Sequence, residues 1–245
     1  MNIKFDSPRR PHPVWDLPLR LFHWLLVATV GFAYVSGKVG GNLIEWHARA
    51  GFAIIGLVSF RLVWGLVGSP TARFSQFVRG PAAIRAYLRG EWQGVGHNPL
   101  GALSVLALLA LVGLQAGSGL FSNDDIAYQG PLAEWVGKEA SDRFHSWHAL
   151  LQQGLLVLIG LHLAALLFYL LVKRENLIRP MITGHARSST HLPLPAPISL
   201  PRRLAGLLLA LGVAAGATAA AAGYWLPEPP AAPPAAAASP AAPGW

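Results

Sequence analysis

The feature that most constrains this chain is a long apolar stretch, residues 146–172, that carries two histidines. Its 27 residues exceed the roughly 20 that an α-helix needs to cross the hydrocarbon core of a bilayer. His148 lies near the start of the stretch, and His162 follows fourteen residues later. Because fourteen residues make almost four helical turns, both rings are expected on nearly the same face, about 21 Å apart along the axis. A histidine deep in a membrane helix indicates a functional site, and the simple alternative is an interfacial residue plus one bonded to a neighbouring helix.

The chain as a whole is predicted to be an all-α polytopic membrane protein. Of its 245 residues, 53% are hydrophobic and only 12% are charged, which is typical of a chain that spans a bilayer several times. The candidate spans are residues 19–36, 47–67, 100–120, 146–172 and 204–226. Residues 19–185 hold the first four of these spans, and a basic linker, 186–203, joins them to a fifth, C-terminal transmembrane helix, 204–226. The remaining parts are an N-terminal segment, 1–18, and a Pro/Ala-rich tail, 227–245.

Basic residues alternate between the loops and predict which end of each span faces the cytoplasm. Residues 1–20, 68–98 and 173–203 together hold 14 of the 19 lysines and arginines, whereas residues 121–145 are acidic. The positive-inside rule therefore places the N-terminus in the cytoplasm and the C-terminus outside. Within the second basic loop, the sequence PAAIRAYLRG (81–90) predicts a short interfacial helix, with proline at its start and arginine on one side.

The residue types and motifs that the chain lacks exclude several kinds of cofactor and metal site. The chain has no cysteine, so disulfides, Cys-ligated zinc, iron–sulfur clusters and covalently attached c-type haem are excluded. The sequence also has no phosphate-binding or zinc-protease motif and no soluble flavin or nucleotide domain, so reductant must arrive through the membrane or from another protein. The net charge of +8 fits the cytoplasmic loops of a membrane protein, and no nucleic-acid partner is expected.

Four histidines fall at two depths once the spans are placed in the membrane. His47 and His148 each open a span at the outer boundary, whereas His23 and His162 lie in the inner halves of the first and fourth spans. Two imidazoles at one depth, from different helices, are what bis-histidine ligation of a b-type haem requires, so the pattern predicts an inner and an outer haem b. His145 also lies near the outer level, but it is about 100° away from the face of His162, which favours His148 as the ligand.

Two arginines and two glycines are further candidates near the haems. Arg61 lies fourteen residues after His47, so it shares that face and reaches the inner level. A buried guanidinium needs an anion, and a haem propionate is a natural partner; snorkelling to the cytoplasmic headgroups is the alternative. Arg20, at the start of the first span, is placed to snorkel towards its N-terminal side and is included among the candidate cofactor-binding residues. Gly51 and Gly31 would let a porphyrin edge approach the backbone, although ordinary helix packing also explains them.

The other histidines have simpler interpretations. His12, His185 and His191 are expected to be solvated in cytoplasmic segments. His97 comes just before Asn98-Pro99 and is expected to mark the entry of the third span, with a part in a quinone or proton site as the alternative.

Short motifs flank the four paired histidines. They are HW early in the first span, HARAGF at the start of the second, GHNPLGAL entering the third, GLFSNDD after it and ENLIRPMITG after the fourth. With the histidine spacing, these motifs resemble the bacterial cytochrome b561 family over roughly residues 14–185 and, more broadly, the di-haem b-type subunits of nickel–iron hydrogenases. The resemblance implies a four-helix core in the bacterial inner membrane, with axial haem ligands at His23, His47, His148 and His162. The fifth helix and its tail depart from the plain four-helix pattern and leave open an added docking partner.

Three functions stay open at this point. The leading hypothesis is the one that the resemblance implies, an electron-transfer cytochrome with two b haems that connects a quinone pool with a redox partner. The second is an enzyme, a quinone-linked oxidoreductase acting on superoxide or ferric iron, and the third is a transporter with a histidine-lined proton or metal path. Expected partners are membrane lipid and, as candidates, a quinone and a cytochrome c, dehydrogenase or hydrogenase. A homodimer also stays open.

Overall fold

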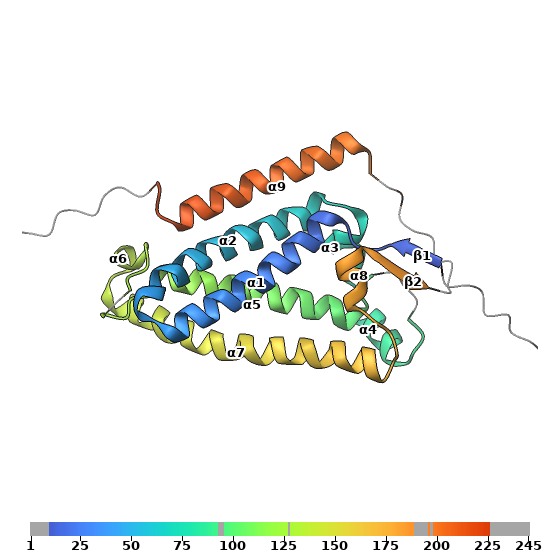
Figure 1. Cartoon of the computed structure of the whole chain (residues 1–245), viewed down its shortest axis with the longest axis horizontal. Helices are drawn as coiled ribbons and strands as arrows, with labels where there is room; N and C mark the ends of the chain where they lie inside the picture. Colours follow the sequence, from blue (N-terminus) through green and yellow to red (C-terminus); the bar gives the residue numbers. More distant parts are fainter. Residues whose placement is uncertain (1–9, 93–95, 127, 189–195, 197, 226–245) are drawn as a thin grey trace, which may run out of the picture.

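The computed structural model describes residues 10–92, 96–126, 128–188, 196 and 198–225 (Figure 1). Within these residues, five helices are long and apolar enough to cross a membrane: α1 (Leu17–Val39), α2 (Ile44–Val67), α5 (Pro99–Phe121), α7 (Lys138–Leu171) and α9 (Leu200–Ala221). The predicted all-α polytopic fold is therefore confirmed. The shorter elements are β1 (Arg10–Pro13), α3 (Phe74–Phe77), α4 (Pro81–Leu88), α6 (Ala133–Val136), α8 (Ile178–Thr183) and β2 (His185–Ser188).

Local sequence signals set where two of the spans begin and where one ends. The carboxylate of Asp16 accepts a hydrogen bond from the backbone N–H of Leu19 at 2.8 Å and so caps α1. The side chain of Asn98 accepts from the backbone N–H of Gly101 at 2.7 Å and caps α5 in the same way. Both helices also carry proline in their first turn, where its missing N–H costs nothing. The helix α1 ends at Gly40, whose φ of 65° suits glycine.

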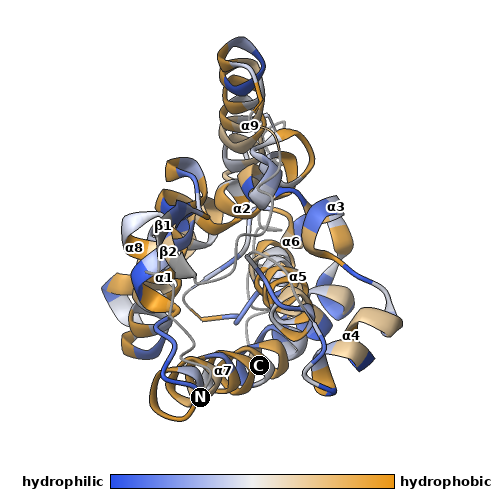
Figure 2. Cartoon of the chain, turned by 90° about the vertical axis from the view of Figure 1, so that its right-hand side faces the viewer, coloured by the Kyte–Doolittle hydropathy of each residue, from blue (hydrophilic) through white to orange (hydrophobic). Residues whose placement is uncertain are grey.

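The helix α2 is the centre of the packing. It packs against α1, α5 and α9, and α5 in turn packs against α7. Seen along the bundle, α1, α2, α5 and α7 surround a common centre, and α9 lies outside them next to α2 (Figure 2). We call the end at which α2 and α7 begin the acidic end, and the end at which α1, α5 and α9 begin the basic end. Within α7, only Ser141 and Leu155 are buried, so this helix is the most loosely embedded of the four.

Large side chains lock α1 to α2 near the basic end. Trp64 is fully buried and packs with Phe60 and Phe22 in one apolar cluster. The indole nitrogen of Trp64 donates to the carboxylate of Asp16 at 3.1 Å, so the residue that caps α1 also fixes the last turns of α2. Because lipid tails are as apolar as these side chains, close packing and such hydrogen bonds provide the association between the helices.

The helix α9 packs on α2 through a row of small residues. Gly206, Ala210, Ala214 and Thr218 recur every four residues, and Ala210 is fully buried. A methyl group on Gly56 of α2 would collide with the hydroxyl of Thr218, which shows how closely the two backbones approach. This is the small-residue packing by which membrane helices commonly associate.

The structure differs from the sequence-based expectations in three places. No strand was expected in the segments that contain His12 and His185, but β1 and β2 pair antiparallel, with His12 opposite Ala186. The predicted boundary after residue 185 therefore falls within β2. The helix α7 begins at Lys138 rather than near residue 146, because the polar residues before the apolar stretch continue the same helix. The predicted tail, 227–245, and His191 lie outside the described residues.

Candidate haem-binding sites

The structure places His47 and His148 side by side at the acidic end. His47 comes from the first turn of α2 and His148 from α7, and their ring centroids are 5.9 Å apart with the planes at 83°. Two in-line metal–nitrogen bonds of about 2 Å hold two ligand nitrogens about 4 Å apart. The spacing of the rings therefore suits a single iron between them.

Hydrogen bonds fix the tautomer of both rings. The Nδ1 of His47 lies 2.7 Å from the carbonyl oxygen of Ala33, which can only accept, so His47 carries its proton on Nδ1. The hydroxyl of Ser118 donates to the carbonyl of Gln115 at 2.9 Å and therefore accepts from Nδ1 of His148 at 3.1 Å. In both rings the lone pair is left on Nε2. This is how metal-binding histidines are usually oriented by their neighbours.

Small residues on two other helices make room for these rings. A Cβ atom on Gly37 of α1 would lie 2.6 Å from Nδ1 of His47, and one on Gly119 of α5 would lie 3.2 Å from Cε1 of His148. Any larger side chain at Gly37 would thus displace His47. At Gly31 and Gly51, by contrast, a Cβ atom would meet nothing within 4 Å.

Gln115 is the one side chain that competes for the acidic-end pair. Its amide nitrogen lies 3.0 Å from Nε2 of His148, and its buried amide oxygen has no hydrogen-bond partner among the described residues. The amide would rotate away from Nε2 when an iron takes that nitrogen. An unpaired buried polar atom beside a histidine pair is consistent with a group that belongs in this space.

His23 and His162 form the second pair, nearer the basic end. They come from α1 and α7 and are close enough to interact electrostatically. The Nδ1 of His23 is buried and has no partner in the part of the chain that the structure describes. Like Gln115, this atom marks a place where the protein alone leaves a polar group unsatisfied.

His97 also lies close to this second pair. From the sequence, a part for His97 in a quinone or proton site was only the alternative interpretation. Its ring packs between Trp15 and Phe77, with centroids 4.6 Å and 4.9 Å away. Burial, followed by the positive charges of Arg61, His162 and His23, lowers the pKa of His97 to about 4. His97 is therefore neutral at pH 7 and belongs to the polar surroundings of the basic-end pair.

Arg61 is buried at the same level. Its side chain is 2% exposed, and the guanidinium lies over the ring of Phe74, 4.5 Å from the centroid. Both terminal nitrogens are buried without a hydrogen-bond partner among the described residues. A side chain in this position does not snorkel to the headgroups. The unpaired guanidinium instead fits an anion inside the bundle.

Arg20 has a different structural setting. One of its terminal nitrogens donates to the carbonyl oxygen of Ile182 in α8, and its buried Nε has no partner among the described residues. Trp24, one turn later, donates to the carbonyl oxygen of Met181 at 3.2 Å. These bonds hold α8 against α1, so Arg20 helps to fasten the basic end of the bundle.

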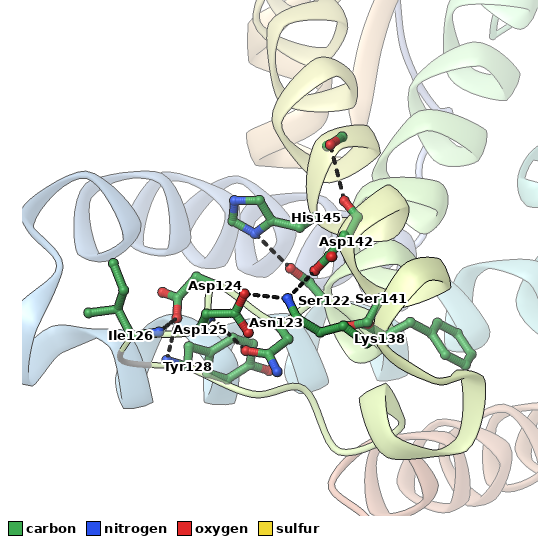
Figure 3. Close-up of polar contacts among 12 residues, drawn as sticks. Ser122, Asn123, Asp124, Asp125, Ile126, Tyr128, Lys138, Ser141, Asp142 and His145 are labelled. Carbon is green, nitrogen blue, oxygen red and sulfur yellow. Dashed lines mark hydrogen bonds and ion pairs between the residues drawn. The ribbon is translucent and has the colours of Figure 1, made fainter.

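An ordered loop closes the acidic end near His145 (Figure 3). His145 lies 3.1 Å from the buried hydroxyl of Ser122, while Ser141 donates to the carbonyl of Phe121 at 2.8 Å. The carboxylate of Asp124 accepts from the backbone N–H groups of Ile126 and Tyr128 at 3.0 and 2.9 Å. The loop therefore ties the start of α7 to the end of α5, which fixes the height of His148 against Ser118.

A second polar cluster lies between α4, α5 and α7 and was not expected. The hydroxyls of Tyr87 and Tyr169 bond each other, and the amide of Asn98 donates to Tyr169 at 2.8 Å. Tyr169 follows His162 by seven residues and so shares its helix face, which is the signal that could have shown it in advance. By contrast, Gln115, Ser118, Gly37 and Gly119 give no signal of their own before the helices are packed.

The described residues offer no group of three or more His, Cys, Asp or Glu side chains that could hold a bare metal ion. The histidines come in facing pairs instead. In the acidic-end pair, the ring spacing and the hydrogen bonds to both Nδ1 atoms fit a flat macrocycle with two axial ligands.

Comparisons with known proteins point to one family. A family model described as prokaryotic cytochrome b561 matches residues 14–184. The probable Ni/Fe-hydrogenase 1 B-type cytochrome subunit of Escherichia coli strain K12 is 22% identical over 179 residues, which cover 57% of this chain and 75% of that protein. The probable Ni/Fe-hydrogenase B-type cytochrome subunit of Azotobacter vinelandii is 25% identical over 218 residues, covering 70% of this chain and 86% of that protein. No solved structure matches the chain significantly.

The family match covers the four helices that surround the histidine pairs and stops before α9. It includes every residue placed in the two sites. The chain therefore belongs to the prokaryotic cytochrome b561 family and is a multi-pass membrane cytochrome that carries haem b and transfers electrons.

Proposed function

We propose that the chain holds two b haems, one between His47 and His148 and one between His23 and His162. The observation that carries this proposal is the acidic-end pair, in which the two rings lie 5.9 Å apart and each is held through its Nδ1. The second pair rests on the same helix α7, and fourteen residues separate the two levels by about 21 Å. Each bound haem would supply a one-electron carrier whose potential its surroundings set.

The protein's own side chains orient the ligands and shape the charge around them. Ala33 and Ser118 hold the two acidic-end imidazoles in the tautomer that leaves Nε2 free. Arg61 provides an unpaired positive charge at the basic-end level, where a propionate would satisfy it. The packed aromatic residues near Trp64 exclude water from that level. These groups would orient the ligands of the acidic-end site and give the basic-end site a positive charge that the other site lacks.

The partners and orientation follow as further parts of the proposal. The related proteins are named as cytochrome subunits of Ni/Fe hydrogenases, which supports a hydrogenase as one redox partner. We propose a quinone pool as the other. The alternatives for the partner are a cytochrome c or a dehydrogenase. The alternative for the activity is direct reduction of a small acceptor, and the chain could also form a homodimer. The concentration of basic residues at one end supports the inner membrane, with the basic end towards the cytoplasm.

Single substitutions of the four histidines test the pairing. We expect His47→Ala and His148→Ala each to lose the acidic-end haem and keep the other, because one axial ligand is removed from one site only. His23→Ala and His162→Ala should do the reverse. Redox titration of the four purified variants should therefore show two matching pairs of curves. If His23→Ala instead resembles His148→Ala, the assignment of ligands to levels is wrong.

His145→Ala is the matched control for His148→Ala, since both are histidines of α7 at the acidic end. His145 bonds Ser122 rather than facing His47, so its loss should leave both low-spin haem signals in the electron paramagnetic resonance spectrum. If His145→Ala loses one low-spin signal and His148→Ala keeps both, His145 and not His148 is the axial ligand.

A further inference from the structure

The two ends of the bundle differ in whether their charged side chains form ion pairs. At the acidic end, Glu45 pairs with Arg49, Lys138 with Asp125 and Asp142, and Arg143 with Glu139. At the basic end, no lysine or arginine among the described residues lies within 4 Å of a carboxylate. The basic end therefore presents cations that the protein does not neutralise itself, and an external anion can do so.

The short helix α4 gathers two of these cations around a hollow. Arg85 and Arg89 are one turn apart, with Ala82 and Ala86 on the same side of the helix. These residues and Glu91 line a shallow hollow of about 280 Å³. Because the alanine side chains are short, we infer that they form its floor, with the longer arginines at its sides.

The opposite side of α4 fixes its height in the membrane. Tyr87 bonds the hydroxyl of Tyr169, which lies in the last turn of α7, and Asn98 at the start of α5 bonds the same hydroxyl. The hollow therefore stands level with the ends of two transmembrane helices, where lipid headgroups lie. Leu88, 68% exposed, points an apolar side chain outward from the same helix.

We propose that this hollow binds the phosphate of an anionic phospholipid, held between Arg85 and Arg89. Two guanidiniums present several N–H donors in a geometry that suits phosphate oxygens, and the alanine floor lets the phosphate approach the helix. The carboxylate of Glu91 at the rim favours a singly charged phosphodiester over free phosphate, which carries more charge. Leu88 provides apolar surface for an acyl chain. An interfacial helix with these features belongs to the lipid-binding class.

Native mass spectrometry of the purified full chain tests this site. With phosphatidylglycerol as the probe, the wild type should bind one more lipid than with phosphatidylcholine. Arg85→Gln/Arg89→Gln should weaken that binding roughly 30-fold, because each arginine near a membrane surface contributes about fivefold. Circular dichroism shows that the variant is folded, and this readout needs no haem, so it is independent of the proposed electron transfer.

The matched control is Arg202→Gln/Arg203→Gln, which removes the same charge from two exposed residues at the same end. It should leave the affinity for phosphatidylglycerol within about threefold, since distant surface charges are screened. Equal weakening in both double variants would overturn the proposal in favour of diffuse attraction to the basic end. Equal binding of both lipids by the wild type would also overturn it, and displacement by excess inorganic phosphate would assign the hollow to soluble phosphate.

Discussion

Arg61 is 2% exposed, and its guanidinium lies against the rings of Phe74 and Phe77. Neither of its terminal nitrogens has a hydrogen-bond partner among the described residues. An isolated buried charge costs several kcal/mol, so the folded protein needs a counter-ion there. The nearest described carboxylate that acts on it electrostatically is that of Asp16, which is already bonded to Trp64 and to the start of α1. A haem propionate at the basic-end level would satisfy the remaining nitrogens.

Neutralising Arg61 should change one haem potential and spare the other. Its positive charge favours the reduced, more negative state of the basic-end haem, so Arg61→Gln should lower that potential. A charge-assisted hydrogen bond contributes roughly 1.5–3 kcal/mol, and only part of it differs between redox states. Since 59 mV corresponds to about 1.4 kcal/mol for one electron, we expect a shift of some tens of millivolts. Potentiometric titration measures both haems in one sample, and the acidic-end haem is the internal control.

Two outcomes of that titration would contradict the account. An unchanged basic-end potential would mean that no propionate depends on Arg61. A shift confined to the acidic-end haem would mean that α2 carries Arg61 to the other level.

At the residue scale, depth along the predicted spans was enough to pair His47 with His148, whose rings lie side by side. The spacing of His148 and His162, and of His47 and Arg61, follows from helical geometry alone. The residues that orient the ligands could not be found in this way. The roles of Ser118 and Gln115 depend on which side of α5 meets α7, and that is decided by packing between helices far apart in sequence.

At the element scale, the contrast between α9 and α7 shows what apolar patterning can and cannot predict. Both were recognised as spans from length and composition, but the sequence did not show which helix each of them packs against. The row from Gly206 to Thr218 fits α2 only because Gly56 leaves space opposite it. The pairing of β1 with β2 was also missed, since four-residue strands carry too little periodicity to be recognised.

The packing of α9 can be tested at Gly56. Leucine at this position would collide with Thr218 and with the backbone of α9, and such overpacking typically costs about 1–3 kcal/mol. Thermal unfolding of the purified protein should therefore shift down by roughly 2–10 °C, while the haem spectrum stays unchanged. Gly212→Leu is the control, because a side chain there meets nothing within 4 Å. Equal melting temperatures for the two variants would show that α9 does not depend on this contact.

At the scale of the whole molecule, α2 and α7 each cross both levels and carry a candidate site residue at each one. His47 and Arg61 lie on α2, and His148 and His162 lie on α7. The ion pairs of the acidic end and the unpaired cations of the basic end give the bundle a polarity along its axis. That arrangement suits a protein that moves electrons between two different environments, one at each end.

The number of haems per chain tests the central claim most directly. Pyridine haemochrome analysis of the purified protein, set against its concentration from amino-acid analysis, should give two b haems per chain. All of the haem should be extracted by acidic acetone, because the chain has no cysteine to attach it. A value of one or none in fully loaded protein, or haem that stays covalently bound, would contradict the two-site account.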